Sequence, residues 1–286
     1  MPQQRYALLG WPVKHSVSPQ MQEAGFRAIG LDASYELVEV PPEQLAHKVR
    51  ELTLRRYCGW NITVPHKLSM LQLVDVIEPA AALAGSINTV VNADGRLVGH
   101  STDGYGLAMA IREAFGLTLP KHHFLFWGAG GAARATSVYF AASGARAITL
   151  VNRTRAKAVT LADAIRAAAP ACAVTVLAPD ETAAIRDRLH DVDALVQATS
   201  VGLHAADPIA IPEELLRPGL NLVDMIYRPT RLLRRAAELG CRAVDGKSML
   251  LHQGVRSFEL WTGANPPPVA TMRAALDAAL AAQAAK

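Results

Sequence analysis

The sequence predicts a two-domain α/β protein, in which an N-terminal α/β domain precedes a Rossmann-like, doubly wound parallel sheet. From residue 121 onward, apolar runs of strand length alternate with Ala- and Arg-rich segments of helical spacing. The first hundred residues contain shorter and more mixed strands between helices. The length of 286 residues lies near the size at which single hydrophobic cores stop growing, which favours two domains.

In the first hundred residues, apolar patterning predicts strands at 5–10, 34–40 and 60–64, and a hairpin over 87–100 that turns at Asn92-Ala93-Asp94-Gly95. Helical spacing predicts helices at 18–30, 42–57 and 66–75. A further helix over 103–116, which opens with Asp103, leads out of this region. We therefore place the domain boundary at 103–104.

The second region has the pattern of a parallel sheet. Predicted strands lie at 123–128, 147–152, 172–177, 193–198, 220–226 and 242–245, with helices such as 154–169 and 230–239 between them. Near-continuous apolar strands joined by helical crossovers form sheets that are covered on both faces. After these strands, two helical patterns separated by a Gly- and Pro-rich break are too short for a third domain. We expect residues 247–286 to complete the 1–103 domain and residues 104–246 to form the Rossmann domain.

Composition narrows the class of protein. The chain is 51% hydrophobic by residue type and carries a formal net charge of +4, which argues against disorder. Its basic residues are spread along the sequence, which favours a small anionic ligand over nucleic acid. We find neither a signal peptide nor a membrane-spanning run, and three scattered cysteines are typical of a reducing compartment. We expect a cytoplasmic monomer or homodimer that binds a small molecule, and neither nucleic acid nor a membrane.

A glycine-rich turn follows the first predicted strand of the Rossmann domain. Gly128, Gly130 and Ala133 fit G-x-G-x-x-A at a strand-to-helix junction. Such glycines let backbone N–H groups approach a pyrophosphate, and the helix N-terminus adds partial positive charge. The alternative is an ordinary strand-to-helix turn, but the position within a six-strand α/β pattern favours a dinucleotide site.

The end of the second strand indicates which dinucleotide binds. An NAD site needs an acid there for the ribose 2′-hydroxyl, whereas an NADP site has cations for the 2′-phosphate. Here Asn152-Arg153-Thr154-Arg155-Ala156-Lys157 contains three cations and no acid. Arg153 directly follows the strand, and a guanidinium binds phosphate through two parallel hydrogen bonds. We predict NADP as the cofactor, although these cations could also be a solvated helix start.

Further motifs occur in a characteristic order. They are Ser16-Val17-Ser18-Pro19, Asn61-Ile62-Thr63-Val64-Pro65-His66-Lys67, Gly85-Ser86-Ile87-Asn88-Thr89, Ser101-Thr102-Asp103-Gly104, Asp224-Met225-Ile226-Tyr227 and Met249…Gln253…Phe258…Trp261. With the glycine turn and Asn152-Arg153-Thr154, these blocks span nearly the whole chain. The sequence resembles the shikimate dehydrogenases.

The resemblance implies reversible, NADPH-dependent reduction of 3-dehydroshikimate to shikimate, in aromatic amino acid biosynthesis. It implies that Lys67 is the acid–base lysine and that Asp103 is its partner. The implied substrate contacts are Ser16, Ser18, Thr63, Lys67, Asn88, Asp103, Tyr227 and Gln253. The implied dinucleotide contacts are Gly128, Ala129, Gly130, Gly131, Ala132, Asn152, Arg153, Thr154 and Arg155, with Met225 and Gly246 near the nicotinamide.

The chemistry suits these residue types. Oxidation of a secondary alcohol needs a positioned proton acceptor as well as the hydride acceptor, and Lys67, at the start of the predicted 66–75 helix, can provide it. Ordinary structural roles also exist: a lysine in a first helical turn is usually solvated, and Asp103 and Ser16 suit helix N-caps. His122-His123 has no third ligand at metal-binding spacing, so we predict no metal site.

Two other functions remain open at this stage. Met21-Gln22 stands where the family usually has His-Asn, and Ser101 stands where it usually has Asn, so a paralogue acting on quinate or aminoshikimate is an alternative. A non-catalytic sensor of NADPH or shikimate is another, although binding alone does not require a proton donor such as Lys67.

Overall fold

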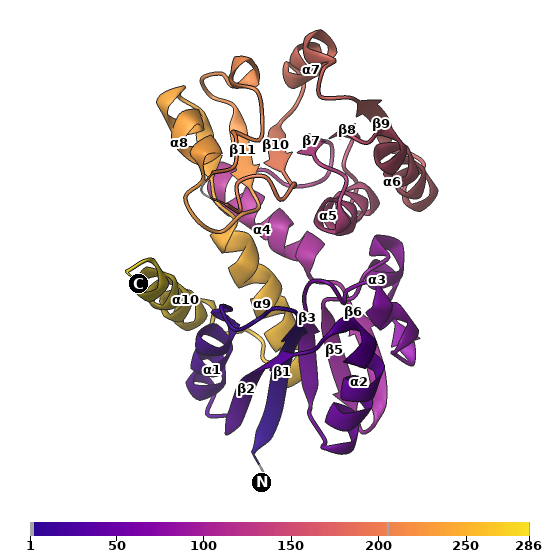
Figure 1. Cartoon of the computed structure of the whole chain (residues 1–286), viewed down its shortest axis with the longest axis vertical. Helices are drawn as coiled ribbons and strands as arrows, with labels where there is room; N and C mark the ends of the chain where they lie inside the picture. Colours follow the sequence, from indigo (N-terminus) through magenta and orange to yellow (C-terminus); the bar gives the residue numbers. More distant parts are fainter. Residues whose placement is uncertain (1–2, 205, 286) are drawn as a thin grey trace. The chain divides into compact units, whose positions relative to one another are not determined.

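The computed structural model describes residues 3–204 and 206–285. The chain forms two compact units, one containing residues 1–102 and 251–286 and the other residues 103–250 (Figure 1). The second boundary lies inside helix α9 (Lys247–Thr262).

The described part of the first unit contains a six-stranded mixed sheet in the order β2-β1-β3-β5-β6-β4. Its strands are β1 (Gln4–Gly10), β2 (Ala33–Glu39), β3 (Gly59–Ile62), β4 (Val76–Ile77), β5 (Thr89–Ala93) and β6 (Arg96–His100). β1 pairs in parallel with β2 and β3, whereas β5 is antiparallel to β3 and β6. The predicted hairpin is confirmed, and Asn92 Oδ1 accepts a hydrogen bond from the Gly95 amide across its turn at 2.8 Å.

Helices of the first unit flank this sheet. They are α1 (Ser18–Ala28), the 3₁₀ turn η1 (Pro42–Gln44), α2 (Leu45–Leu54), the 3₁₀ turn η2 (Ser69–Gln72), α3 (Pro79–Ala84), the later part of α9, and α10 (Val269–Ala284). α10 packs against α1, and the Phe26 ring of α1 stacks on Phe258 of α9 with centroids 5.3 Å apart. The end of the chain therefore belongs structurally to the first unit.

The predicted helix over 66–75 is wrong. Residues 64–68 form turns, the 3₁₀ turn η2 follows, and β4 begins at Val76. Two long-range hydrogen bonds explain this: His66 Nε2 lies 2.6 Å from the Val40 carbonyl oxygen, and the Ile87 amide donates to the Lys67 carbonyl at 3.0 Å. These tertiary bonds take the place of helical ones. Lys67 consequently lies in a turn and does not begin a helix.

The second unit contains, within its described residues, a six-stranded parallel sheet in the order β12-β11-β10-β7-β8-β9. Its strands are β7 (His123–Trp127), β8 (Ala147–Val151), β9 (Ala173–Leu177), β10 (Ala194–Gln197), β11 (Asn221–Asp224) and β12 (Arg242–Val244). Its helices include α4 (Asp103–Phe115), α5 (Gly131–Ala142), α6 (Arg155–Ala168), α7 (Thr182–Leu189), η3 (Glu213–Leu215) and α8 (Arg231–Glu238). The predicted doubly wound sheet is confirmed.

This strand order positions a ligand site. The chain leaves β7 toward β8 on one side and returns to β10 on the other, so the order reverses beside β7. In open α/β sheets, ligands bind outside the carboxyl ends of the strands at such a reversal. The turn at 128–131, directly after β7, lies at this point.

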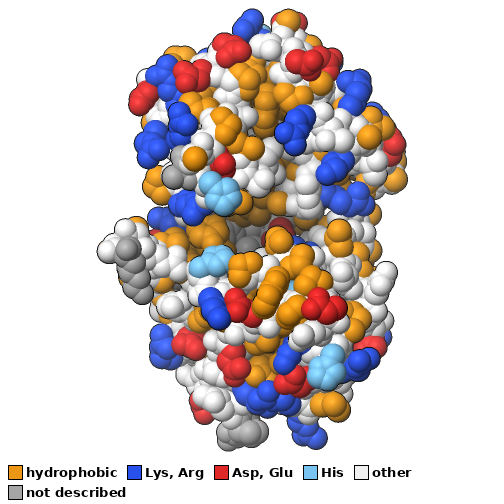
Figure 2. Space-filling model, viewed as in Figure 1, with side chains coloured by type: hydrophobic (Ala, Val, Ile, Leu, Met, Phe, Trp, Pro, Cys, Tyr) orange, Lys and Arg blue, Asp and Glu red, His pale blue; other side chains and the backbone are white. Residues whose placement is uncertain are grey.

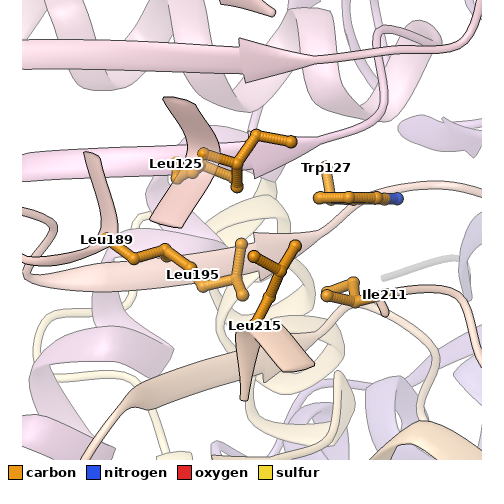
Figure 3. Close-up of a pocket in the computed structure, with 7 residues that line it drawn as sticks. Leu125, Trp127, Leu189, Leu195, Ile211 and Leu215 are labelled. Carbon is orange, nitrogen blue, oxygen red and sulfur yellow. The ribbon is translucent and has the colours of Figure 1, made fainter. Parts of the chain in front are cut away.

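The central strand is buried on both faces. Phe124 and Phe126 of β7 pack on Phe140 of α5, while Leu125 and Trp127 point to the opposite face. There they line a small apolar pocket together with Ile185, Leu189, Leu195, Ile211 and Leu215 (Figure 3). The two-residue alternation and the burial of both faces are what a parallel sheet requires.

In the part of the chain that the structure describes, no helix has the length and apolar character needed to cross a bilayer. On the face drawn in Figure 2, lysine and arginine side chains are interspersed with aspartate and glutamate.

Candidate active site

Two of the predicted substrate contacts lie where β1 leads into α1. The Ser16 hydroxyl donates to Ser18 Oγ at 3.1 Å and accepts from the Ser18 amide at 3.2 Å. Ser16 thus binds the amide two residues ahead, in a local side-chain turn just before α1, whose N-cap residue is Val17. The two hydroxyl groups are held together at the carboxyl end of β1.

Thr63 and Lys67 follow the carboxyl end of β3. The Thr63 amide donates to the Leu9 carbonyl of β1 at 2.9 Å, and the His66 amide donates to the Thr63 carbonyl at 3.0 Å. The buried His66 ring is hydrogen-bonded to the Val40 carbonyl, and the Lys67 carbonyl accepts from the Ile87 amide. These two bonds anchor the turn that carries the half-buried Lys67. The backbone that carries the Lys67 ammonium group is therefore well fixed.

Asn88 and Gln253, which are 165 residues apart in the chain, meet in the first unit. Asn88 Nδ2 donates to Gln253 Oε1 at 3.4 Å and to Thr102 Oγ1 at 2.9 Å. Asn88 Oδ1 accepts from the Thr102 amide at 2.8 Å. Asn88 is buried rather than exposed beside the hairpin, so its side chain does more than complete a turn.

The sequence did not predict a buried polar network that adjoins Asn88. Asn61 Nδ2 lies 3.0 Å from Ser257 Oγ and 3.1 Å from both Thr89 Oγ1 and the Asn88 carbonyl. Tyr35 donates its hydroxyl proton to Asn61 Oδ1 at 2.7 Å, and burial raises the pKa of that phenol. Ser257 Oγ lies 2.7 Å from Thr89 Oγ1. The network joins β3, which precedes Thr63, and β5, which follows Asn88, to α9, which carries Gln253.

Only one feature of the sequence pointed toward this network. Asn61 is a polar residue at a buried position of the apolar strand β3, and buried polar groups need hydrogen-bond partners. Its partner Ser257 is 196 residues away, and nothing in the sequence indicated that the two meet.

Asp103 is the first residue of α4 and is buried. A carboxylate is favoured at a helix N-terminus by the helix dipole. The adjacent Gly104 allows close packing of α4 on α5, because a Cβ there would lie 2.3 Å from Tyr139. Asp103 belongs to the second unit and Lys67 to the first, and their pairing stays a prediction.

The glycine-rich turn after β7 has the geometry of an anion cradle. Gly128 has φ of +122°, which favours glycine, and its amide donates to the Val151 carbonyl of β8 at 2.8 Å. α5 begins at Gly131, and a Cβ added at Gly130 or Gly131 would meet open space. The Ala129 amide donates to Asn152 Oδ1 at 3.1 Å. The open space above a helix N-terminus fits a dinucleotide pyrophosphate.

The predicted phosphate-binding segment follows β8. Asn152 Nδ2 donates to the Thr154 carbonyl at 2.8 Å, so one side chain braces both the glycine turn and this segment. Arg153, Thr154 and Arg155 are exposed, and α6 begins at Arg155. Exposed guanidinium groups at this strand end fit the 2′-phosphate of NADP.

Met225 and Gly246 lie side by side in the second unit. The Gly246 amide donates to the Ile226 carbonyl at 3.1 Å, and a Cβ on Gly246 would lie 2.2 Å from the Met225 carbonyl oxygen. The fully buried Asp224 holds this turn, because its carboxylate accepts from the Ile226 amide at 3.1 Å and from the Thr230 hydroxyl at 2.7 Å. Burial raises the pKa of Asp224.

Tyr227, a predicted substrate contact, follows this turn. Its side chain is partly exposed, at 36%, rather than packed as an ordinary strand residue. It is the one predicted substrate contact besides Asp103 that belongs to the second unit.

The chain is similar to known proteins over most of its length. Family models match at residues 8–90 (shikimate dehydrogenase substrate binding domain), 110–210 (shikimate / quinate 5-dehydrogenase) and 246–276 (shikimate 5′-dehydrogenase C-terminal domain). A shikimate dehydrogenase (NADP(+)) of Rubrobacter xylanophilus is 42% identical, and the alignment covers 94% of each chain. The chain belongs to the shikimate dehydrogenase family.

Solved structures of this family have the same fold. Shikimate 5-dehydrogenase of Listeria monocytogenes, in complex with shikimate and NAD, is 33% identical, with a TM-score of 0.89 over 96% of each chain. The Thermus thermophilus enzyme, in complex with NADP(H) and shikimate, is 34% identical with a TM-score of 0.83, over 96% of this chain and 99% of that one.

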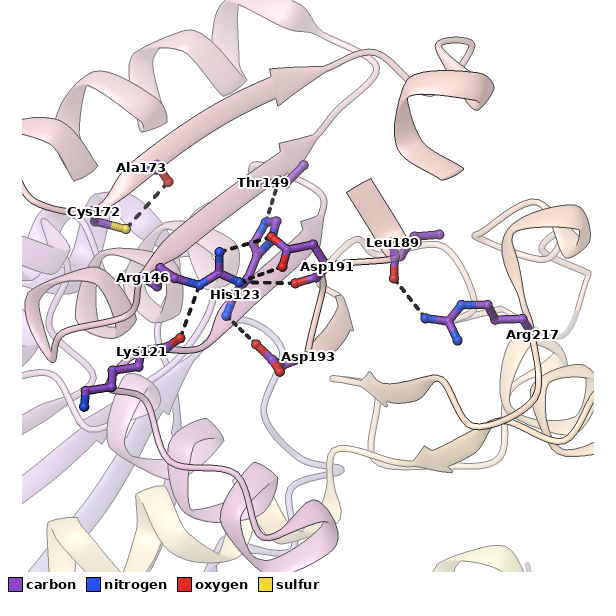
Figure 4. Close-up of polar contacts among 10 residues, drawn as sticks. All are labelled: Lys121, His123, Arg146, Thr149, Cys172, Ala173, Leu189, Asp191, Asp193 and Arg217. Carbon is purple, nitrogen blue, oxygen red and sulfur yellow. Dashed lines mark hydrogen bonds and ion pairs between the residues drawn. The ribbon is translucent and has the colours of Figure 1, made fainter. Parts of the chain in front are cut away.

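His123, the second residue of the histidine pair, takes part in a polar cluster at the start of β7. His123, at the start of β7, places Nε2 2.9 Å from Thr149 Oγ1 and Nδ1 3.3 Å from Asp191 Oδ2, and Arg146 pairs with the same carboxylate (Figure 4). Burial lowers the pKa of His123. Among residues 3–204 and 206–285, no group of three or more His, Cys, Asp or Glu residues is suited to hold a metal ion.

Proposed function

We propose that this chain is an NADP-dependent shikimate dehydrogenase that interconverts 3-dehydroshikimate and shikimate in aromatic amino acid biosynthesis. The observation that carries the proposal is the 42% identity, over 94% of both chains, with a relative named shikimate dehydrogenase (NADP(+)). The hydrogen bond between the buried Asn88 and the half-buried Gln253 supports it, since fixed polar groups suit a substrate with several hydroxyl groups and penalise ligands that lack them. The exposed Arg153 supports the choice of NADP.

In the proposed reaction, bound NADPH supplies the hydride to the carbonyl carbon. The Lys67 ammonium group donates a proton to the carbonyl oxygen as it becomes a hydroxyl, and solvent then restores the proton to the amine. In the reverse direction the neutral amine removes the hydroxyl proton. Asp103 is the predicted partner of Lys67 in this proton transfer.

The two domains predicted from the sequence have different roles in this proposal. Residues 1–103 and 247–286 bind the substrate and carry Lys67, and residues 104–246 bind the dinucleotide. The substrate contacts are Ser16, Ser18, Thr63, Lys67, Asn88, Asp103, Tyr227 and Gln253. The dinucleotide contacts are residues 128–132 and 152–155, with Met225 and Gly246 beside the nicotinamide. A cytoplasmic location and a monomeric or dimeric state remain sequence-based predictions.

The proposal is tested by assaying the purified chain with shikimate, quinate and aminoshikimate, each with NADP⁺ and NAD⁺. We expect the highest kcat/KM with shikimate and NADP⁺, measured as NADPH absorbance. A higher kcat/KM with quinate or aminoshikimate identifies a paralogue, and the matching family model covers quinate dehydrogenases as well. Binding of shikimate or NADPH without any turnover would identify a sensor and reject the enzymatic proposal.

A further inference from the structure

Arg155, one of the cations at the end of β8, is paired with an acidic residue. Its Nη1 lies 3.3 Å from Oε2 of Glu181. Glu181 follows β9 and immediately precedes α7. The sequence interpretation considered the acids of the β8 segment alone, and so it missed a carboxylate supplied by the neighbouring strand.

The backbone fixes Glu181 at this edge of the sheet. Its Oε2 accepts from the Ala178 amide at 2.5 Å, and its carbonyl accepts from the Ile185 amide at 3.0 Å. The Asn152 amide donates to the Leu177 carbonyl at 3.2 Å, which joins the ends of β8 and β9. The carboxylate therefore lies at the same sheet edge as the segment proposed to bind the 2′-phosphate.

A carboxylate at this edge affects the two dinucleotides differently. It compensates the positive charge of Arg155, and it repels a phosphate monoester, which carries about −1.5 to −2 at neutral pH. NAD has a neutral hydroxyl in place of that phosphate, so the same carboxylate changes its binding little. The Arg155–Glu181 pair as a whole is neutral, so the preference for NADP then depends on the other two cations of the segment, Arg153 and Lys157.

We infer that Glu181 is a specificity-determining residue, which limits the preference for NADP over NAD by compensating Arg155 and repelling the 2′-phosphate. The inference rests on the proposed dinucleotide site after β8. It differs from a role in which Glu181 orients Arg155 toward the phosphate, because the two roles predict opposite effects of removing the carboxylate.

The first test is Glu181→Gln, with kcat/KM measured for NADP⁺ and NAD⁺. We expect the NADP⁺/NAD⁺ ratio to rise about threefold to tenfold at low salt, and less in about 1 M salt, where exposed charges are screened. Glu213→Gln is the matched control, because it removes the same charge from an exposed pair with Arg235 (2.7 Å) in the same unit. An unchanged or lower ratio in Glu181→Gln overturns the inference.

Arg155→Gln completes the comparison. The single variant is expected to lower the NADP⁺/NAD⁺ ratio, because Glu181 then remains uncompensated. The double variant Glu181→Gln/Arg155→Gln removes a neutral pair and should return the ratio to within about twofold of the wild type. If Glu181 instead orients Arg155, the NADP⁺/NAD⁺ ratio should be lowered to the same value in both single variants and in the double variant.

A binding measurement separates this inference from the proposed activity. Calorimetry compares 2′,5′-ADP, which has the 2′-phosphate, with 5′-AMP, which lacks it, and needs no turnover. If the wild type fails to oxidise shikimate but Glu181→Gln still gains affinity for 2′,5′-ADP relative to 5′-AMP, the inference stands and the proposed activity fails. If Glu181→Gln binds both nucleotides as the wild type does, the inference fails, whatever the activity.

Discussion

The two units present their predicted ligand contacts in different ways. In the first unit, Asn88 and Gln253 are held by side chains in a buried network that includes Asn61 and Ser257. In the second unit, a main-chain turn is braced by Asn152, and the predicted phosphate contacts are exposed arginines. Buried polar networks are costly when one member is lost, whereas exposed charges are screened by solvent and salt.

The difference separates two kinds of specificity. A network that is rigid and fully hydrogen-bonded can discriminate the arrangement of hydroxyl groups on a small ligand, and its variants should lose stability and substrate binding together. Exposed cations discriminate charge, so their variants should change cofactor preference in a salt-dependent way with little loss of stability.

The largest effect should come from the chemical step in the first unit. Lys67→Ala is expected to lower kcat about a hundredfold to ten-thousandfold, because proton transfer by a positioned group contributes that much, with a smaller change in KM. Steady-state kinetics with shikimate and NADP⁺ measure it. Lys48→Ala, which removes a lysine paired with Glu51 on α2, should keep wild-type kinetics; near-normal turnover in Lys67→Ala would remove the lysine from the mechanism.

Next in size is the loss of the central network residue. Asn61→Ala leaves Tyr35, Thr89 and Ser257 with incomplete hydrogen bonding in the core, and we expect a loss of about 2–4 kcal/mol in the free energy of unfolding. Denaturant titration measures this loss, and the KM for shikimate should rise more than the KM for NADP⁺. Ser257→Ala is the milder companion, expected to cost about 1 kcal/mol. Equal stability of Asn61→Ala and the wild type would contradict a preorganised first unit.

In the second unit, Arg153→Gln should change specificity and not stability. Loss of a hydrogen-bonded charge pair with the phosphate costs about 1.5–3 kcal/mol, so the NADP⁺/NAD⁺ ratio of kcat/KM should fall about tenfold to a hundredfold. Arg166→Gln, which removes a guanidinium paired with Asp163 on the same helix, should leave the ratio unchanged. A loss of stability in Arg153→Gln comparable with that of Asn61→Ala would erase the contrast between the two units.

The smallest effect concerns His123, at the opposite end of the β7 strand from the glycine turn. Burial holds its pKa below the usual 6.5, so the unfolded chain binds a proton more readily. The free energy of unfolding should therefore fall as the pH decreases through 6.5 toward the folded pKa. Asp191, whose pKa is lowered mainly by Arg146, adds to this loss at lower pH.

His123→Gln should reduce this pH dependence between about pH 7.5 and pH 5.5, and denaturant titrations at several pH values measure it. The kinetic constants at neutral pH should match those of the wild type. A changed KM for NADP⁺ in His123→Gln would show that the amino-terminal end of β7 affects dinucleotide binding at its carboxyl end. That result would contradict the expectation that the two ends act independently.

The sequence predicted the second unit better than the first, for a physical reason. Its strands are continuous apolar runs with local helical crossovers, so short-range patterns determine both the elements and their parallel order. The turn after β3 is different: Val40 and Ile87, far away in the sequence, bind His66 and Lys67 and override a local helical pattern. The short helix α3, which begins at Pro79, also went unpredicted.

The site shows the same limit. The motifs supplied Asn88 and Gln253 separately through the family resemblance, and the structure brings them together at 3.4 Å. The residues that support them, such as Asn61 and Ser257, and the carboxylate of Glu181 beside Arg155, depend on contacts between distant parts of the chain. Sequence spacing contains no information on such contacts.

The contact of Gly246 with the Met225 carbonyl has a consequence for how relatives of this protein are interpreted. Any larger amino acid at position 246 would collide with main chain, at 2.2 Å, whether or not a nicotinamide ever binds beside it. Selection for folding alone would then retain this glycine in the product of a duplicated gene, even if that protein had lost its catalytic activity. The presence of glycine at this position is therefore evidence of an intact architecture, and activity must be judged from the residues proposed to carry the reaction, such as Lys67.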